Sequence, residues 1–501
     1  MIPEVENAIF RLHSRAADWL EVPPEERIGY LRRCMAGAME VAEDWAIEAC
    51  KAKGIDIAGE EWLTGSVTTL MMLGAIVKTL EGRTANIENG IARVFPDNLL
   101  DRLLWLGFRG EIWVDQTPVE KHDRPGISLV LGAGNVGSTA PLDALHKLFA
   151  ENQVVLLKMN PVNEYVGKFL EQAFEPLITD GFLQIVYGGA DVGKYLCQHP
   201  KIDAIHVTGS HHTYYAIANS SQKPITSELG CVTPVLIVPG DWSESDLKFQ
   251  ARHVASMVVH NASFNCVAAK VIVTAKGWKL RDRFLDLLRQ EFARIPNRKA
   301  YYPGAQERYQ EFIDRYPQAE IFGTRTDEIV PWTFIPNVEN DYALQTEAFC
   351  GVLAEVSLEA TTVEEFLDRA IPFCNEKIWG NLSCVILTKT PVENAIRELN
   401  YGAIGINVWT GIIYALPDLA WGAYPGNDHS DIQSGQGFVH NAYFLDRPQK
   451  SVLYAPFRIF PTPFWFADHK NLLQFARRAA ELQISPTWSK FAQVIFAAIR
   501  G

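Results

Sequence analysis

Apolar positions in the first hundred residues recur at helical spacing. The acidic, proline-led segment Pro23-Pro24-Glu25-Glu26 is typical of a helix start. Apolar side chains then follow on one face of the predicted helix: Ile28, Leu31, Ala36, Met39 and Ala42. We therefore expect the N-terminal region to be helical.

From Gly126 the pattern changes to short apolar runs separated by segments of helix length. These runs predict strands at residues 127–131, 154–157, 185–187, 204–207, 235–238, 271–273, 351–356 and 383–387. Strands that alternate with helices favour a doubly wound parallel sheet. We predict an α/β fold of two such lobes, residues 1–228 and 229–430, followed by a C-terminal extension at 431–501.

Length and composition fit a soluble enzyme. The 501 residues suggest about three domains. A net charge of −13 disfavours nucleic acid and anionic membrane as partners. The eight cysteines form no CxxC pair, which suits a reducing compartment, and the first residues lack the order of a signal peptide. The most apolar stretch, 402–417, is short and interrupted, so we expect a cytoplasmic protein without an integral membrane segment.

A glycine-rich loop follows the first predicted strand of the parallel pattern. Gly132-Ala-Gly134-Asn135-Val-Gly137 has the spacing of a dinucleotide fingerprint. That fingerprint also needs an acid about 20 residues later, whereas the next strand ends in Lys158-Met-Asn-Pro161. Three interpretations stay open: a pyrophosphate cradle, a plain glycine turn, or a loop that presents Asn135.

Several further motifs occur at strand ends in a fixed order. They are Gly188-Gly189-Ala-Asp-Val-Gly193, Thr208-Gly209-Ser210, Ser227-Glu228-Leu229-Gly230, Asn261-Ala-Ser-Phe-Asn-Cys266 and Glu347-Ala-Phe349. Each motif alone is common in proteins, and most single cysteines are structural. The order and spacing of the whole set are much more specific.

This ordered set resembles the aldehyde dehydrogenase superfamily from about Trp113 to about Gly426. The family's Asn-x-Gly-Gln-x-Cys motif is similar to 261–266, its Glu-Leu-Gly-Gly to 228–231, and its Glu-x-Phe-Gly-Pro to 347–351. Ser263 and Phe264 replace the usual glycine and glutamine. The resemblance implies a cofactor-binding lobe, a catalytic lobe and an oligomerisation hairpin at about 108–125.

The resemblance implies three catalytic residues. Cys266 would attack the aldehyde, because a thiolate forms an adduct that can expel hydride. The Asn135 amide and the backbone N–H of Cys266 would stabilise the resulting oxyanion. Glu228 would act as the general base that hydrolyses the thioester.

The resemblance also implies an NAD or NADP site. The residues matched to it are Lys158, Gly189, Gly193, Thr208, Gly209, Ser210, Glu347 and Phe349. Lys158 would hold the adenosine end, Ser210 a phosphate, and Glu347 the nicotinamide ribose. Pro161 stands where NAD-preferring members often have an acid, so the sequence leaves the choice between NAD and NADP open. We predict no metal ligand.

The predicted reaction is the oxidation of a hydrophobic aldehyde by a homodimer or homotetramer. One alternative is NADPH-dependent acyl-CoA reduction through the same cysteine, and another is a non-catalytic superfamily member. Ser485 and Pro486 resemble the start of a last helix with Trp488, Phe491, Ile495 and Ile499 on one face. This helix has three possible roles: packing against the protein or a second subunit, gating a hydrophobic tunnel, or peripheral membrane contact.

Overall fold

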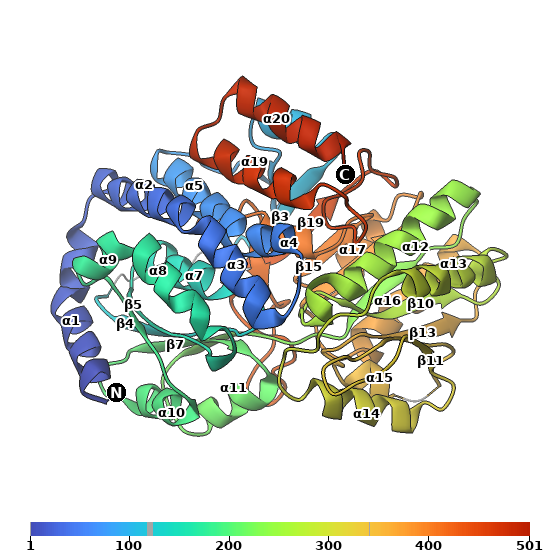
Figure 1. Cartoon of the computed structure of the whole chain (residues 1–501), viewed down its shortest axis with the longest axis horizontal. Coiled ribbons are helices and arrows are strands. Elements are labelled where there is room, and N and C mark those ends of the chain that lie inside the picture. The colour runs from blue at the N-terminus through green and yellow to red at the C-terminus, as the bar shows by residue number, and fades with distance from the viewer. Residues whose placement is uncertain (1, 118–123, 340) are drawn as a thin grey trace.

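The computed structural model describes residues 2–117, 124–339 and 341–501, which form two α/β lobes lying side by side (Figure 1). A layer of N-terminal helices covers the first lobe. Its elements are α1 (Ile2–Glu21), α2 (Pro24–Glu40), α3 (Ala42–Lys53), α4 (Ala58–Trp62), a π-helical turn (Leu63–Val67) and α5 (Thr68–Leu80). Helix α2 begins after Pro23, as predicted, because the fixed φ of Pro24 suits a first helical turn.

The first lobe is built on the smaller sheet, in the order β17-β8-β7-β4-β5-β6. Its strands are β4 (Ile127–Leu131), β5 (Val154–Lys158), β6 (Leu183–Val186), β7 (Ala204–Gly209), β8 (Ile225–Leu229) and β17 (Gly435–Gln436). Its helices are α7 (Thr139–Leu145), α8 (Gly167–Ala173), α9 (Glu175–Thr179), α10 (Ala190–Gln198) and α11 (His211–Ala218), with short helical turns at His146–Ala150 and Pro161–Val166. Strands β4 to β8 are parallel, so their carboxyl ends share one edge.

The second lobe is built on the larger sheet, in the order β1-β2-β3-β19-β15-β14-β9-β10-β13-β12-β11. Its strands beyond the first three are β9 (Thr233–Ile237), β10 (Ala269–Ala275), β11 (Glu320–Phe322), β12 (Trp332–Ile335), β13 (Val352–Leu358), β14 (Ser383–Leu387), β15 (Ala403–Ile406) and β19 (Pro448–Tyr454). Strands β16 (Trp421–Gly422) and β18 (Phe438–Val439) form a separate pair.

Helices pack around this larger sheet (Figure 1). They are α12 (Glu244–Val259), α13 (Arg281–Arg294), α14 (Ala305–Arg315), α15 (Tyr342–Gln345), α16 (Val363–Lys377), α17 (Glu393–Glu398) and α18 (Gly411–Ala415), with a 3-10 turn at His260–Ser263. Two mainly parallel sheets with helical layers confirm the predicted α/β class.

The small β element extends the larger sheet. It contains β1 (Ile87–Glu88), β2 (Ile91–Phe95), α6 (Leu99–Leu104) and β3 (Arg109–Val114). Strand β3 pairs antiparallel with β2 and with β19. The predicted hairpin at 108–125 includes 118–123, which lie outside the described residues. Strands from the first predicted lobe thus join the sheet of the second, and a division at residue 228 stays a prediction.

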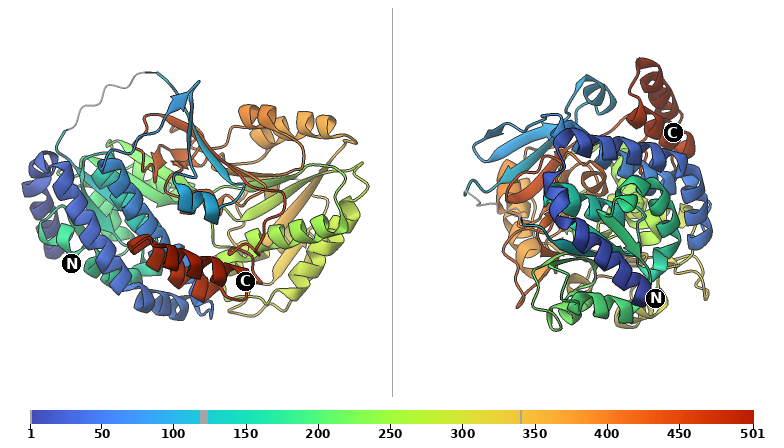
Figure 2. Two further views of the ribbon diagram at one scale, coloured as in Figure 1. Left: turned by 90° about the horizontal axis from the view of Figure 1, so that it is seen from above. Right: turned by 90° about the vertical axis from the view of Figure 1, so that its left-hand side faces the viewer.

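The C-terminal region ends in a helical hairpin of α19 (Leu472–Ile484) and α20 (Trp488–Ile499). The predicted start of the last helix at Ser485 is wrong. The Ser485 N–H donates to Glu481 O and closes α19, whereas Thr487 Oγ1 accepts from the Lys490 N–H at 3.3 Å and caps α20. Both helices lie on the outside of the molecule, and α19 packs against α4 and α5 (Figure 2).

One segment of the described chain, residues 58–80, is long and apolar enough to cross a membrane by length and composition. It comprises α4, the π-helical turn and α5, and 61% of its most apolar window is buried inside the protein. The stretch predicted to be the most apolar, 402–417, instead forms β15 and α18 within the core.

Candidate active site

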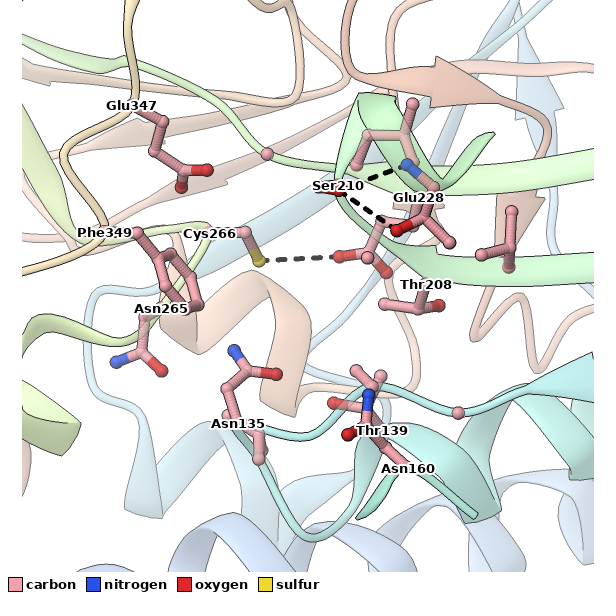
Figure 3. Close-up of a pocket in the computed structure, with 18 of the residues that line it drawn as sticks. Asn135, Thr139, Asn160, Thr208, Ser210, Glu228, Asn265, Cys266, Glu347 and Phe349 are labelled. Carbon is pink, nitrogen blue, oxygen red and sulfur yellow. Dashed lines mark hydrogen bonds between the residues drawn. The ribbon is translucent and has the colours of Figure 1, made fainter. Parts of the chain in front are cut away.

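A cavity of about 1210 Å³ is lined by residues of both lobes. All the site residues predicted from sequence line this cavity: Asn135, Lys158, Gly189, Gly193, Thr208, Gly209, Ser210, Glu228, Cys266, Glu347 and Phe349. Figure 3 shows that Cys266 lies near their centre, with Glu228 on one side, Glu347 and Phe349 on the other, and Asn135 below. The carboxyl ends of parallel strands carry several of these residues, which is where doubly wound folds place ligands.

Cys266 follows a strained turn between α12 and β10. Asn261, Ala262 and Ser263 have φ of 51°, 53° and 69°, a left-handed conformation that side chains other than glycine rarely adopt. The Cys266 thiol donates to Glu228 Oε1 at 3.5 Å. Burial raises the pKa of this thiol well above its ordinary value, and Glu228 and Glu347 raise it further. In the resting site the thiol is therefore protonated.

Glu228 lies on β8 and is almost fully buried. Burial raises the pKa of its carboxyl to about 8, and the charge of Asp143 acts in the same direction. A base whose pKa is close to neutral can both accept and release a proton at physiological pH. Glu228 and Cys266 thus have the hydrogen-bonded arrangement that a base and a nucleophile would need.

Glu347 lies over the backbone of Gly230. A Cβ added at Gly230 would come within 2.0 Å of Glu347 Oε2, so only glycine permits this approach. Burial raises the pKa of Glu347 to about 7, although Lys270 opposes that rise. Lys270 also donates to Ser263 O at 3.1 Å. The buried Lys270 therefore interacts both with Glu347 and with the loop before Cys266. The sequence analysis did not identify it, because its only signal was a lysine inside the apolar run of β10.

The glycine-rich loop after β4 presents Asn135 toward Cys266 (Figure 3). Asn135 Nδ2 donates to Phe264 O at 3.0 Å, which ties the loop to the segment that carries Cys266. A Cβ at Gly134 would lie 2.7 Å from Asn160 Oδ1, and one at Gly132 would lie 2.9 Å from the Cβ of Ala140. These two glycines are required by close packing around the loop. That geometry favours the interpretation in which the loop presents Asn135.

Six of the predicted cofactor residues lie at or just after the carboxyl ends of β5, β6 and β7, a part of the lining here called the cofactor end: Lys158, Gly189, Gly193, Thr208, Gly209 and Ser210. Gly189 precedes α10, and Ser210 caps α11 by accepting from the Thr213 N–H at 3.2 Å. A Cβ added at Gly193 or at Gly209 would meet open space. Helix starts beside open backbone suit phosphate groups. Lys158 adds a cation at the end of β5, so the residues present at this end fit a dinucleotide.

Aromatic side chains from distant segments form another part of the cavity lining, here called the aromatic end. Trp409 Nε1 donates to Val267 O at 2.8 Å, and the Trp409 ring lies 4.8 Å from that of His260. Burial lowers the pKa of His260, although Glu60 opposes that change. Phe464 and Trp465 complete this wall. Their aromatic-rich segment was visible in the sequence, but nothing local assigned it to the cavity.

The last helix takes no part in this wall. Within the described ranges, the lining residues include Phe464 and Trp465 but none from α20. Helix α20 packs on α19 at the surface and leaves Trp488 61% exposed, so a gating role for this helix stays a prediction. In the described part of the chain, no cluster of His, Cys, Asp and Glu side chains has the geometry of a metal site.

Comparisons with known proteins agree with this architecture. Residues 126–418 match the model of the aldehyde dehydrogenase family. A Staphylococcus haemolyticus protein, provisionally named an aldehyde dehydrogenase, is 26% identical over 325 residues, which are 60% of this chain and 65% of that protein. The alignment thus spans slightly less than two thirds of that relative.

Two solved structures share the fold at low sequence identity. The NAD-dependent aldehyde dehydrogenase of Sinorhizobium meliloti has a TM-score of 0.68 at 18% identity, over 92% of this chain and 88% of that one. The NADP-dependent glyceraldehyde-3-phosphate dehydrogenase of Bacillus halodurans C-125, complexed with NADP, has a TM-score of 0.66 at 18% identity, over 90% and 91%. Since the family model covers more than half of the residues, this chain belongs to the aldehyde dehydrogenase family.

Proposed function

We propose that this protein oxidises a hydrophobic aldehyde to the carboxylic acid, with NAD+ or NADP+ as the hydride acceptor and Cys266 as the nucleophile. The observation that carries the proposal is the 3.5 Å hydrogen bond from Cys266 Sγ to Glu228 Oε1, inside a cavity that also contains Asn135. Acyl chemistry through a thiol requires a nucleophile, a base and an amide donor that lie close together.

The first step moves a proton and forms a carbon–sulfur bond. Glu228 accepts the proton of the Cys266 thiol, and the resulting thiolate attacks the aldehyde carbon. The carbonyl oxygen then gains negative charge. The Asn135 amide and the Cys266 backbone N–H are the donors assigned to that oxygen, and one such donor is worth about 3 kcal/mol in the transition state.

The cofactor end supplies binding and orientation. Lys158 would hold the adenosine end, Ser210 and the start of α11 a phosphate, and Glu347 with Phe349 the nicotinamide riboside. When bound, the nicotinamide accepts the hydride that leaves the adduct carbon. Of the two structural neighbours, one is NAD-dependent and the other NADP-dependent, and this chain has Pro161 rather than an acid after Lys158, so we include both cofactors.

The last step hydrolyses the thioester on Cys266. Glu228 first releases the thiol proton to solvent. It then removes a proton from water, the hydroxide attacks the acyl carbon, and the thiolate leaves and takes that proton back from Glu228. Because the pKa of Glu228 is about 8, the fraction of this base that is ready rises as the pH approaches and passes 8.

The aromatic end supports a hydrophobic aldehyde. Trp409, Phe464, Trp465, Ile412 and Leu63 contribute apolar surface there. Aromatic and aliphatic walls bind a ligand mainly by removing its apolar surface from water. His260 is held neutral by burial, so it offers this end no fixed charge for a carboxylate or phosphate on the substrate.

A cofactor-absorbance assay with straight-chain aldehydes of graded length tests the proposal. We expect reduction of NAD+ or NADP+ that improves with chain length, and none with Cys266→Ala. Cys50→Ala is the matched control, because Cys50 is the other cysteine that is only partly buried and it lies outside the cavity lining. Turnover by Cys266→Ala, or turnover only in the reductive direction with an acyl-CoA, would contradict the proposal.

We also propose a cytoplasmic homodimer or homotetramer. Leu99, Leu103 and Leu106 are apolar side chains exposed on and after α6, next to the edge of the larger sheet. Such a surface suits association with a second copy. Light scattering of the purified protein should give two or four times 56.1 kDa, and a mass of 56.1 kDa at micromolar concentration would contradict it.

A further inference from the structure

A buried charge cluster links the N-terminal helices to the loops of the candidate active site. It contains Lys53 at the end of α3, Glu60 and Glu61 on α4, and Arg298 from the second lobe. The first three residues are 2%, 3% and 4% exposed, and the Arg298 side chain is 10% exposed. Two cations and two anions balance, as buried charges must.

The cluster binds Asn261 at two points, in addition to its internal ion pairs. Lys53 Nζ lies 2.9 Å from Glu61 Oε1 and also donates to Asn261 Oδ1 at 3.0 Å. Glu60 Oε1 accepts from the Asn261 backbone N–H at 2.6 Å and from Arg298 Nη1 at 3.1 Å. The side-chain oxygen and the main-chain nitrogen of one residue are thus both fixed by charged groups, and charge-assisted hydrogen bonds are the strong ones.

Asn261 is the first of the left-handed residues that precede Cys266. Backbone in this conformation persists only where the surroundings over-determine it. Burial would raise the pKa of Glu60, but Arg298, His260 and the Asn261 N–H together hold that pKa at about 2. The carboxylate that fixes the turn is therefore ionised throughout the neutral range.

The same contacts reach the loop of Asn135. Asn261 Nδ2 donates to Asn135 O at 3.0 Å and to Phe264 O at 3.1 Å. The Tyr301 hydroxyl is within 3.0 Å of both Asn135 O and Asn261 Oδ1. The assigned oxyanion donor and the nucleophile are consequently tied to one anchor.

We infer that this cluster is a positioning device, in which Lys53 and Glu60 act through Asn261 to hold Cys266 against Glu228 and Asn135. Lys53, Glu60 and Glu61 precede residue 126, where the family match begins, so the N-terminal layer contributes to the site from outside the matched region. The inference rests on the proposed function only for the effect on turnover.

The chain offers a matched control cluster outside the cavity lining. Glu355 is fully buried, accepts from Arg281 at 2.8 Å, and accepts from the backbone N–H of Asn337, whose φ is 51°, at 3.0 Å. Glu355→Gln therefore removes the same kind of charge from the same kind of turn. We expect Glu355→Gln to lower the stability of the protein and to leave the reactivity of Cys266 unchanged.

The experiment measures alkylation of Cys266 by iodoacetamide, followed by mass spectrometry of the Cys266 peptide, together with the melting temperature and kcat. In Glu60→Gln, release of the turn exposes the thiol to water and brings its pKa back toward the ordinary range. We expect alkylation to become at least fivefold faster while kcat falls at least tenfold. Glu355→Gln should lower the melting temperature by a comparable amount, but it should change neither the alkylation rate of Cys266 nor kcat.

A rise in alkylation smaller than fivefold, or an equal rise in Glu355→Gln, would overturn the inference. If Glu60→Gln does not fold, Glu60→Gln/Arg298→Met removes both charges of the pair and leaves neither buried alone. Alkylation needs no aldehyde and no cofactor. A wild-type protein that turns over no aldehyde would therefore refute the proposed function while the alkylation comparison still decides the positioning role.

Discussion

The two ends of the cavity differ in whether backbone or side chains line them. The cofactor end is mainly backbone, with glycines at 189, 193 and 209 beside the starts of α10 and α11, whereas the aromatic end is made of side chains such as Trp409 and Trp465. A side chain added at one of these glycines would occupy space that the proposed cofactor needs. Side chains at the second end set how much apolar surface a ligand can bury, so that end is where specificity can change without loss of the chemistry.

The largest expected effect lies where the two ends meet. Asn135→Ala removes the assigned oxyanion donor and should lower kcat about 100-fold or more, equally for short and long aldehydes. Steady-state kinetics across a chain-length series would measure it. Asn163→Ala is the control, because Asn163 Nδ2 supports the same loop through Ala133 O at 2.9 Å from outside the cavity lining. A comparable loss of kcat in Asn163→Ala would assign the effect to loop stability.

Glu228→Gln should slow both the first burst of reduced cofactor and steady turnover about 100-fold, since glutamine can accept neither the thiol proton of Cys266 nor a proton from water. In the wild type, the pKa of Glu228 of about 8 predicts that hydrolysis rises with pH up to and through 8. The variant should lack that rise. Stopped-flow absorbance from pH 6 to 9 separates the two phases, and a burst of wild-type rate in the variant would show that Glu228 does not accept the thiol proton.

The raised pKa of Glu228 should speed hydrolysis as the pH rises, but it should lower the stability of the folded protein over the same pH range. The folded protein holds the Glu228 proton up to about pH 8, whereas an unfolded glutamate releases it near its ordinary pKa of 4.5. The contribution of this group is therefore fully present below pH 4.5 and is lost as the pH rises to 8. Thermal melts of Glu228→Gln and wild type at pH 6 and pH 8.5 should show a larger advantage for the variant at pH 8.5. An equal difference at both pH values would contradict the shift.

Gly193→Leu tests the cofactor end of the cavity directly. A leucine there would extend into open space that lines the cavity, so the KM for the cofactor should rise about tenfold with little change in aldehyde preference. Gly29→Leu is the matched control, because a Cβ at Gly29 on α2 also meets open space, away from the cavity lining. An unchanged cofactor KM in Gly193→Leu would mean that the cofactor binds elsewhere.

Trp409→Ala tests the aromatic end and should have the smallest effect on the chemistry. We expect a several-fold shift in preference among long aldehydes and an unchanged cofactor KM, because apolar contacts are worth about 1–3 kcal/mol per group. Trp488→Ala on α20 should leave preference unchanged, since Trp488 is 61% exposed outside the cavity lining. A shift of equal size in Trp488→Ala would support a gating role for the last helix.

Residues that act through local motifs were predictable from sequence. Glu228 lies on a strand, Cys266 follows the turn between a helix and a strand, and the glycines of the cofactor end lie at or near helix starts; these motifs keep a fixed order along the chain, and the structure brings them to one cavity. The roles assigned to them remain predictions that the experiments above address. The α/β class was predictable for the same reason, because alternating periodicity is a local property.

Residues that act through contacts between distant segments were not predictable. Trp465 reaches the cavity from the C-terminal region, and Lys53 reaches Asn261 across 208 residues of chain. Neither contact leaves a local pattern. The start of α20 was misplaced for a related reason: both Ser485 and Thr487 are plausible caps, and only the end of α19 decides between them.

The protonated state of Cys266 has a consequence for oxidative stress. Peroxide attacks thiolates far faster than thiols, and a sulfinic acid at this position would be irreversible. A thiol whose pKa is raised by burial and by two carboxylates is therefore shielded while the site is at rest. The hydrogen bond to Glu228 that the proposed mechanism uses to activate Cys266 would thus also protect the thiol from oxidants while no substrate is bound.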